Sequence, residues 1–173
     1  NVLRQKGLTG TGWALAWKAK SWARLGEGKI AHSHLHALLS PVLATQVEMA
    51  MDGGGVFPNM PTAHPPMQID ANFGYAAALL DMLVQANESE VILLPALPRE
   101  WVSGALRGVR LPGGGTLDVE WDETTVHGKV TLESRESTRL FHKCNKTLIA
   151  FATGPIEEFS FPQNPSHFGK TVV

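Results

Sequence analysis

The chain has 173 residues, of which 43% are hydrophobic and 18% are charged, a composition typical of one ordinary globular domain or two small ones and not of a disordered chain. With 15 basic and 16 acidic residues its formal net charge is −1, which excludes the basic field that nucleic acid or an anionic membrane would attract. No apolar run approaches the roughly 18 residues of a membrane span. A neutral partner is therefore expected.

The first predicted elements are a loop and two helices. Residues 1–11 are expected to be irregular, because glycines are separated there by small or polar residues. Apolar side chains at helical spacing predict helices over residues 13–25 and 29–40. The first helix is apolar on most of its sides, so it requires neighbours on more than one face. Trp13, at its start, has two interpretations: a core side chain or an aromatic platform for a sugar ring.

Three histidines, His32, His34 and His36, alternate along the second predicted helix and suggest a metal site at first sight. On a helix only His32 and His36 share a face, and no nearby carboxylate or third ligand completes a site. We therefore expect these histidines to be structural or exposed, and we expect the chain to hold no metal.

A proline-containing arm follows a weaker apolar stretch over residues 42–51 and a glycine break. Pro65 and Pro66 each fix their own φ and keep the preceding residue out of the α region, which predicts a stiff, extended arm. Apolar residues then recur at helical spacing from Ala71 to Ala86, which predicts a helix that ends near Asn87.

Asp70 stands immediately before this helix, in the natural N-cap position. In one interpretation it caps the helix by accepting a backbone N–H, a contribution of about 1 kcal/mol. In the other, one carboxylate oxygen caps while the second faces a cleft and activates or positions a reactant. The spacing is compatible with both roles.

The second half of the chain is predicted to be β-structure. Residues 90–94 form a short buried apolar run, and alternation over residues 117–121 predicts a strand with one wet face. Further strands are expected over residues 126–132, 139–142 and 147–152, and the proline-rich tail from residue 154 is expected to be irregular. A helical block followed by strands predicts an α+β layout, with a boundary between residues 87 and 100.

One motif adds a resemblance to these patterns. Residues 64–74 read His-Pro-Pro-Met-Gln-Ile-Asp-Ala-Asn-Phe-Gly and closely resemble the signature of glycoside hydrolase family 95, the inverting α-L-fucosidases and α-L-galactosidases, with Met67 in place of the usual phenylalanine. Residues 9–18, 22–25 and 93–98 resemble further segments of the same family, in the same order. The resemblance covers roughly residues 9–121.

The resemblance implies a fold and an origin for the chain. Residues 1–90 would supply the closing helices of an (α/α)6 barrel, incomplete here, and residues 91–173 a small, all-β C-terminal domain. The chain is thus expected to be the C-terminal portion of a longer enzyme, with the upstream part of its own barrel as its structural partner.

The resemblance also implies site residues. Inverting cleavage needs a carboxylic acid on the leaving oxygen and a carboxylate that activates water on the opposite face. Asp70 matches the family's aspartate on the base side, where it works with a pair of upstream asparagines, and the family's glutamic acid also lies upstream. His64 and Asn72 match motif positions and would bind substrate. His64 could instead brace the loop, and Asn72 could bond within the first helical turn.

The implied activity is exo-acting, inverting release of terminal α-1,2-linked L-fucose from glycans, with α-L-galactosidase of the same family as the alternative. The partner would be a fucosylated or L-galactosylated oligosaccharide, and acid–base chemistry on a neutral sugar requires no cofactor. The chain alone is expected to be inactive. A rival interpretation is a non-catalytic carbohydrate-binding or structural module. Asn87 and Asn145 each begin a tripeptide that fits the acceptor pattern for N-glycosylation. This pattern is compatible with a secreted protein but does not determine the localisation.

Overall fold

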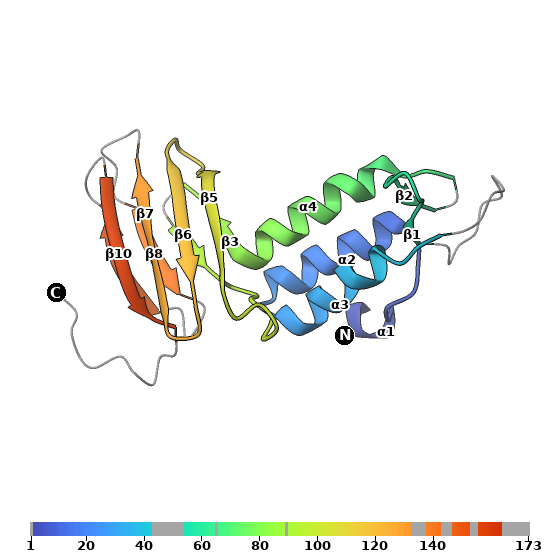
Figure 1. Ribbon diagram of the computed structural model, residues 1–173, viewed down its shortest axis with the longest axis horizontal. Coiled ribbons are helices and arrows are strands. Elements are labelled where there is room, and N and C mark those ends of the chain that lie inside the picture. Colours follow the sequence, from blue (N-terminus) through green and yellow to red (C-terminus); the bar gives the residue numbers. More distant parts are fainter. Residues whose placement is uncertain are drawn as a thin grey trace. The chain divides into compact units, whose positions relative to one another are not determined.

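The computed structural model describes residues 2–42, 54–64, 66–88, 90–132, 138–142, 147–152 and 156–163. Contacts divide the chain into two compact units: Asn1–Leu83 with Ala96–Pro98 form unit 1, and Val84–Pro95 with Arg99–Val173 form unit 2. Unit 1 holds helices and one two-stranded sheet, and unit 2 holds strands (Figure 1). The α+β class predicted from the sequence is confirmed.

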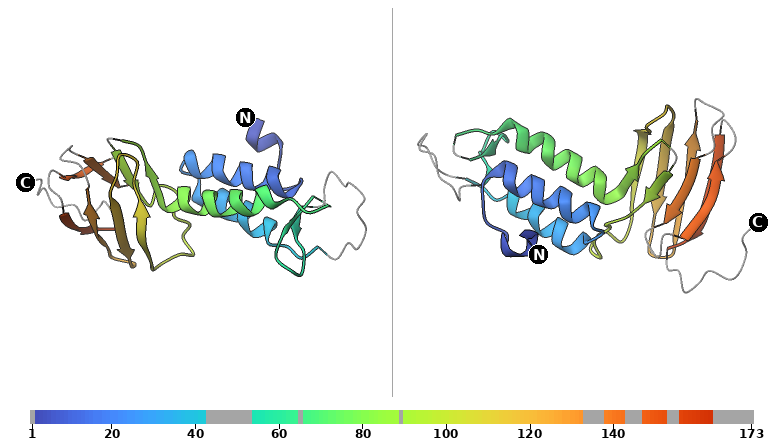
Figure 2. Two further views of the ribbon diagram at one scale, coloured as in Figure 1. Left: turned by 90° about the horizontal axis from the view of Figure 1, so that it is seen from above. Right: turned by 180° about the vertical axis from the view of Figure 1, so that it is seen from behind.

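Unit 1 is built on three packed helices, α2 (Gly12–Arg24), α3 (Gly28–Leu38) and α4 (Ile69–Leu83). Figures 1 and 2 show them side by side, and α2 packs on both α3 and α4. The helices predicted over residues 13–25 and 29–40 are confirmed within one or two residues. Among the described residues, no helix combines the length and the apolar character that crossing a membrane needs.

The helices α2 and α4 run in the same direction and approach each other closely. A Cβ added to Gly74 would lie 2.8 Å from the Cβ of Ala16, so only glycine permits this separation. The packing here also buries Leu15, Leu38 and Ala71, against which Ala37 and Tyr75 pack. Gly12 and Ala16 of α2 and the last glycine of the 64–74 motif therefore lie in one interface.

At the other end of the α2–α4 interface lies a buried carboxylate. Asp81 of α4 is 7% exposed. Its oxygens accept hydrogen bonds from Lys20 Nζ at 2.5 Å and from Arg24 Nε at 2.9 Å, both on α2. Because a buried charge is costly unless it is paired, these contacts fix the register of the two helices.

Three sequence predictions were wrong in detail. Residues Val2–Gln5 form a one-turn helix, α1, where a loop was expected, because Lys6 N–H bonds back to Val2 O. The helix predicted over residues 71–86 stops at Leu83, and Val84–Ala86 form strand β3 because their backbone pairs with β4. The tail expected to be irregular contains strand β10, Ile156–Pro162, in which buried Phe159 and Phe161 alternate with exposed residues.

Unit 2 consists of two four-stranded sheets. One has the order β10-β7-β6-β5 and is antiparallel throughout. Its remaining strands are β5 (Gly104–Arg110), β6 (Thr116–Trp121) and β7 (Thr125–Thr131). The other has the order β3-β4-β8-β9, with β4 (Glu90–Leu93) parallel to β8 (Thr138–His142) and β8 antiparallel to β9 (Thr147–Ala152).

The buried residues of the antiparallel sheet follow a period of two. Along β6 the side chains of Leu117, Val119 and Trp121 are buried, and the intervening ones are partly exposed. Period-two burial leaves one wet face, as the sequence predicted. The strands expected over residues 90–94, 117–121, 126–132, 139–142 and 147–152 are confirmed, whereas β5 was not predicted. The apolar stretch 42–51 lies, apart from Val42, outside the described residues.

Candidate functional site

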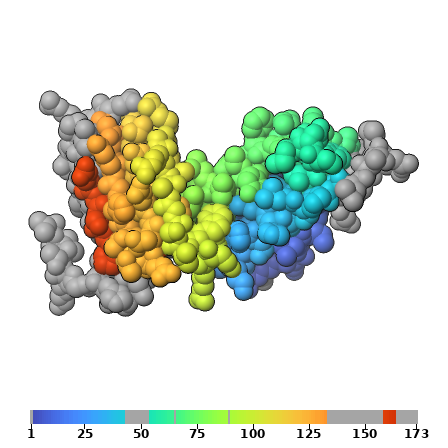
Figure 3. Space-filling model, viewed as in Figure 1, coloured from blue at the N-terminus to red at the C-terminus, as the bar shows by residue number. Residues whose placement is uncertain are grey.

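The segment that carries the motif folds back on itself before α4 begins. Strands β1 (Gly55–Val56) and β2 (Thr62–Ala63) pair antiparallel, and Ala63 also bridges to Met67. His64 N–H donates to Pro66 O at 2.8 Å, and Gln68 N–H donates to Thr62 O at 2.7 Å. The prediction of an extended arm was therefore wrong, because main-chain hydrogen bonds close the segment into a tight reversal. Figure 3 shows this region packed against the start of α4.

Thr62 joins the reversal to α4. It is 2% exposed, and its N–H donates to Asn72 Oδ1 at 2.8 Å. Its hydroxyl lies within hydrogen-bonding distance of both Asn72 Oδ1 and the Gln68 carbonyl oxygen. We call Thr62, Gln68 and Asn72 the clasp, since they tie the loop that carries His64 to the helix that carries Asp70.

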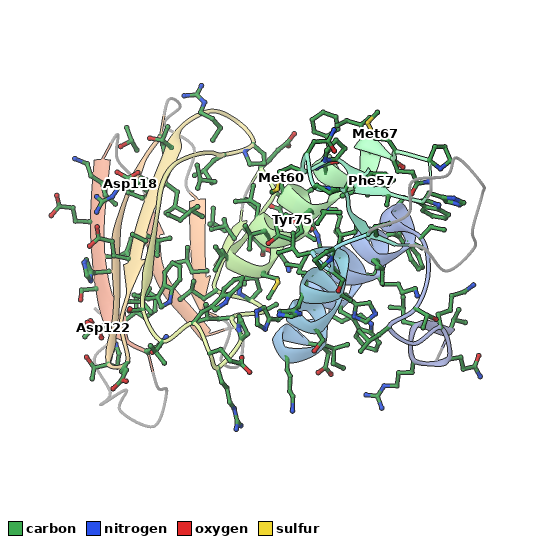
Figure 4. The ribbon with its side chains drawn as sticks, turned by 45° about the vertical axis from the view of Figure 1, so that its right-hand side comes forward. Phe57, Met60, Met67, Tyr75, Asp118 and Asp122 are labelled. Atoms are coloured by element: carbon green, nitrogen blue, oxygen red, sulfur yellow. The ribbon has the colours of Figure 1, made fainter. Side chains whose placement is uncertain are left out.

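Asn72 completes the clasp from the helix side. Its Nδ2 donates to Met60 O at 3.1 Å, so both ends of the side-chain amide hold the loop at residues 60–62 (Figure 4, in which Met60 is labelled). The side chain does not bond within its own helical turn, which was one of the two interpretations from sequence. Met60 itself has φ of 77°, a left-handed conformation that costs free energy for a residue with a side chain. The clasp therefore holds a strained turn.

Asp70 lies inside the first turn of α4 and its side chain is exposed. The helix begins at Ile69, one residue earlier, so the prediction that Asp70 is the N-cap was wrong. Residue 68 precedes the helix, and its backbone carbonyl accepts the Ala71 N–H at 3.2 Å. Among the described residues, none donates a hydrogen bond to the Asp70 carboxylate. A carboxylate in a first helical turn interacts favourably with the helix dipole while its oxygens stay available.

Gln68 links the motif to α2. Its Oε1 accepts the backbone N–H of Trp13 at 3.1 Å, one of the first N–H groups of α2, which has no partner within the helix. A Cβ added to Gly12 would lie 2.8 Å from Ala63 O, so a side chain at Gly12 would separate the two segments. The start of α2 and the start of α4 are thereby held together.

A cavity of about 530 Å³ opens beside these helix starts. His64 lines it, together with Trp13, Trp17 and the loop that precedes α2. Asp70 and Asn72 do not line it. The structure therefore places His64 at a cavity and ties Asn72 to the loop that carries His64. Asp70 lies exposed in the first turn of α4, near the junction where the starts of α2 and α4 meet.

Lys18 fixes the wall of this cavity. Its side chain is on α2, 3% exposed, and its Nζ donates to the carbonyl oxygens of Lys6, Gly7 and Thr9 at 3.1, 3.1 and 2.6 Å. Burial, and then the nearby charge of Lys6, lower the pKa of Lys18 from its usual value. A buried ammonium is tolerated because all three of its donors are used.

His34 supports the same loop from α3. It is 2% exposed, and its ring nitrogens lie 2.9 Å from Ile30 O and 3.2 Å from Gly7 O. The expectation that this histidine is structural is met by its burial and its two backbone contacts. In the part of the chain that the structure describes, no three His, Cys, Asp or Glu side chains gather as metal ligands would.

Sequence reasoning missed three residues that shape the site. Gln68 lies in the motif but was given no role. Lys18 was given no role either, although a lysine among apolar neighbours was the signal for a buried cation. Thr62 carried no sequence signal, because its partners lie six and ten residues away and depend on the reversal.

Comparisons with known proteins identify the family. The model of the glycosyl hydrolase family 95 catalytic domain matches residues 1–83, and that of the glycoside hydrolase family 95 C-terminal domain matches residues 85–164. The chain is 41% identical to alpha-L-fucosidase 2 of Arabidopsis thaliana over 147 residues, which cover 82% of the chain and 17% of that protein.

Two fungal proteins are similar over a comparable stretch. The identity to probable alpha-fucosidase A of Aspergillus oryzae is 37% over 124 residues, or 66% of the chain and 16% of that protein. The identity to probable alpha-fucosidase A of Aspergillus niger is 34% over 127 residues, or 67% of the chain and 15% of that protein. The chain thus spans less than a fifth of the length of these relatives. With two models of one family matching consecutive parts of it, and with the motif at residues 64–74, the chain belongs to glycoside hydrolase family 95.

Proposed function

We propose that the protein carrying this chain is an exo-acting, inverting glycoside hydrolase that releases terminal α-1,2-linked L-fucose from glycans. Membership of the family supports a glycoside hydrolase, and the names of the three relatives support fucosides as substrates. The observation that carries the proposal is Asp70, an exposed carboxylate in the first turn of a helix whose start is held by the clasp.

In this proposal Asp70 is the base. Inversion requires a water on the face of the sugar opposite the leaving oxygen, with two carboxyl groups roughly 6.5–9.5 Å apart. Asp70 would take a proton from that water as the oxygen attacks the anomeric carbon, and a glutamic acid outside this chain would protonate the leaving oxygen. The clasp matters because misplacing such a group by about 1 Å can cost about a hundredfold in rate.

We propose that His64 and Asn72 contact the substrate. His64 lines the cavity and its imidazole could exchange a hydrogen bond with a sugar hydroxyl. Asn72 uses one N–H of Nδ2 on Met60 O, and its second N–H can donate to a hydroxyl while the clasp stays intact.

The domain assignment is part of the same proposal. The helices within residues 1–90 would close an (α/α)6 barrel that other parts of the protein complete, and residues 91–173 would form its β-rich C-terminal domain. A parallel pair, α2 and α4, with α3 returning beside them, is consistent with helices of such a barrel. The substrate is a neutral sugar and the acid–base mechanism needs no cofactor.

The nearest alternative is release of α-L-galactose, which differs from fucose by one hydroxyl. The names of the relatives favour fucose. The test is the hydrolysis of an α-1,2-linked fucosyl disaccharide and its L-galactosyl counterpart by the full-length protein, followed by proton NMR. We expect faster release of fucose, with the β-anomer formed first. Initial formation of the α-anomer would contradict inversion, and no release of either sugar would contradict the proposed function.

A further inference from the structure

The cavity beside the start of α2 has an aromatic wall that the proposed mechanism does not use. Trp13 and Trp17 lie one helical turn apart on α2, and both line the cavity. They are 48% and 50% exposed, whereas Trp22 on the same helix is buried. Two adjacent indoles at about half exposure present flat apolar surface to the cavity at little cost in side-chain freedom.

The loop before α2, which also lines the cavity, is held in place by polar groups of the chain. The loop over residues 6–11 is held by Lys18, which satisfies three of its carbonyl oxygens from a position that is 3% exposed. Two further contacts fix the loop: His34 Nε2 lies 3.2 Å from Gly7 O, and the Gly54 N–H donates to Gly10 O at 3.1 Å. Because burying an ammonium is costly, a wall built around one keeps its shape.

The cavity includes one of the three predicted site residues and excludes the other two, Asp70 and Asn72. His64 lines it and Asp70 does not. A ring bound here would contact the histidine of the motif without contacting the base. The volume of the cavity, about 530 Å³, lies within the range of roughly 300–1,000 Å³ that is typical of small-molecule binding sites.

We propose that this cavity binds the sugar ring to which the fucose is attached, with its C–H face on the indoles of Trp13 and Trp17. This inference rests on the proposed function, because it requires that the protein cleaves fucosides. An indole face matches the apolar face of a pyranose, and the polar edge of the ring would meet His64 and the loop before α2. Trp13 and Trp17 thereby select the leaving group.

The test compares two substrates in the full-length protein. One is an α-1,2-linked fucosyl-galactose, whose galactose would occupy the cavity, and the other is α-L-fucosyl fluoride, whose leaving group is too small to reach it. In Trp13→Leu and Trp17→Leu we expect kcat/KM for the disaccharide to fall by about tenfold while the value for the fluoride is unchanged. Leu80→Ala, which shortens an exposed residue of α4 outside the cavity, is the control and should leave the ratio unchanged.

Conservative variants separate recognition from folding. Trp13→Phe and Trp17→Phe keep a flat ring and should restore most of the disaccharide rate, and they give the readout if the leucine variants unfold. Equal losses on both substrates, or no change in their ratio in any variant, would overturn the inference while leaving the proposed function in place. A wild-type protein that cleaves neither substrate would overturn both.

Discussion

Thr62 is the residue on which the geometry of the junction depends. Its main-chain N–H and O and its hydroxyl all have partners at the start of α4. It is also buried, so a lost hydrogen bond cannot be replaced by water. Without the contacts of Thr62, the loop that carries His64 would be free to move relative to the helix that carries Asp70.

We expect Thr62→Val, which keeps the shape but removes the hydroxyl, to lower kcat in the full-length protein by about tenfold or more. The free energy of unfolding should fall by about 1–3 kcal/mol, because the buried hydrogen bond that the hydroxyl donates, to the Gln68 carbonyl oxygen or to Asn72 Oδ1, is lost. Steady-state kinetics and chemical unfolding measure the two effects. Ser33→Ala is the matched control, since it removes a hydroxyl on α3 that donates to Lys29 O within the same helix. Unchanged turnover in Thr62→Val would show that the clasp does not position the site.

The sequence singled out candidate site residues but did not predict their local geometry. Eleven consecutive residues indicated the family, and Asp70 was singled out from them. Its place in the helix was misjudged by one residue because Ile69 joins the first turn. The clasp could not be predicted, since its partners meet only after residues 62–68 reverse direction.

At the scale of elements, α2 and α4 form the interface on which unit 1 is built. Gly74 faces Ala16, and the added Cβ of an alanine would lie 2.8 Å from Ala16 Cβ, too short for two carbon atoms. The helices could accommodate the added carbon only by moving apart. That movement would also disturb the hydrogen bonds from Lys20 and Arg24 of α2 to the buried Asp81 of α4.

Gly74→Ala is therefore expected to destabilise the protein by about 1–3 kcal/mol, although alanine favours a helix by up to about 1 kcal/mol over glycine. Thermal unfolding of the full-length protein measures the change. The double variant Gly74→Ala with Ala16→Gly should recover most of the loss, because it returns the missing space. A single variant as stable as the wild type would mean that the two helices are not in this contact.

In unit 2 the turn between β6 and β7 is organised by one carboxylate, Asp122 (labelled in Figure 4). Its oxygens accept hydrogen bonds from the N–H groups and hydroxyls of Thr124 and Thr125, at 2.7–3.1 Å. These bonds, led by that from the Thr124 N–H, hold the pKa of Asp122 well below its usual range. Gln163 N–H donates to Thr124 O at 2.8 Å, so the turn also anchors the end of β10.

A lowered pKa in the folded state means that the contribution of Asp122 to stability is complete above the carboxyl's unfolded pKa of about 4 and is lost as the pH falls below it. We expect Asp122→Asn to be less stable than the wild type at pH 7 and to lose less of its stability between pH 5 and pH 2. Chemical unfolding across that range measures both. Glu123→Gln, which removes a neighbouring charge from the same turn, is the control. Parallel pH profiles for wild type and Asp122→Asn would contradict the account.

The elements differ in how well the sequence predicted them, and the reasons are physical. α2 and α3 were predicted because their apolar spacing matches a helix over more than ten residues. β10 was missed because its flanking prolines concealed a period-two pattern at Phe159 and Phe161. The helical pattern in the sequence continues for three residues beyond the end of α4 at Leu83. These residues, Val84–Ala86, form β3 instead, because their backbone pairs with β4.

At the scale of the whole molecule, unit 1 leaves apolar surface uncovered. On α4 the side chains of Ile69, Phe73 and Leu80 recur at helical spacing and are 51%, 71% and 41% exposed. A soluble protein rarely exposes such a stripe. The chain also spans less than a fifth of the length of its relatives.

We expect the 173-residue chain on its own to release no fucose and to self-associate. The physical reasons are that the proposed acid lies outside it and that the exposed stripe of α4 has no cover. Hydrolysis of the fucosyl disaccharide and light scattering measure the two properties, with the full-length protein as the positive control. Fucose release by the chain alone would show that both carboxyl groups lie within these residues.

The most direct measurement of the central claim is the turnover of Asp70→Asn in the full-length protein. If Asp70 activates the attacking water, kcat should fall by two or more powers of ten while KM stays close to that of the wild type, because the amide keeps the shape but cannot take a proton. Turnover equal to that of the wild type would contradict the account and leave Asp70 as an exposed residue of the first turn of α4.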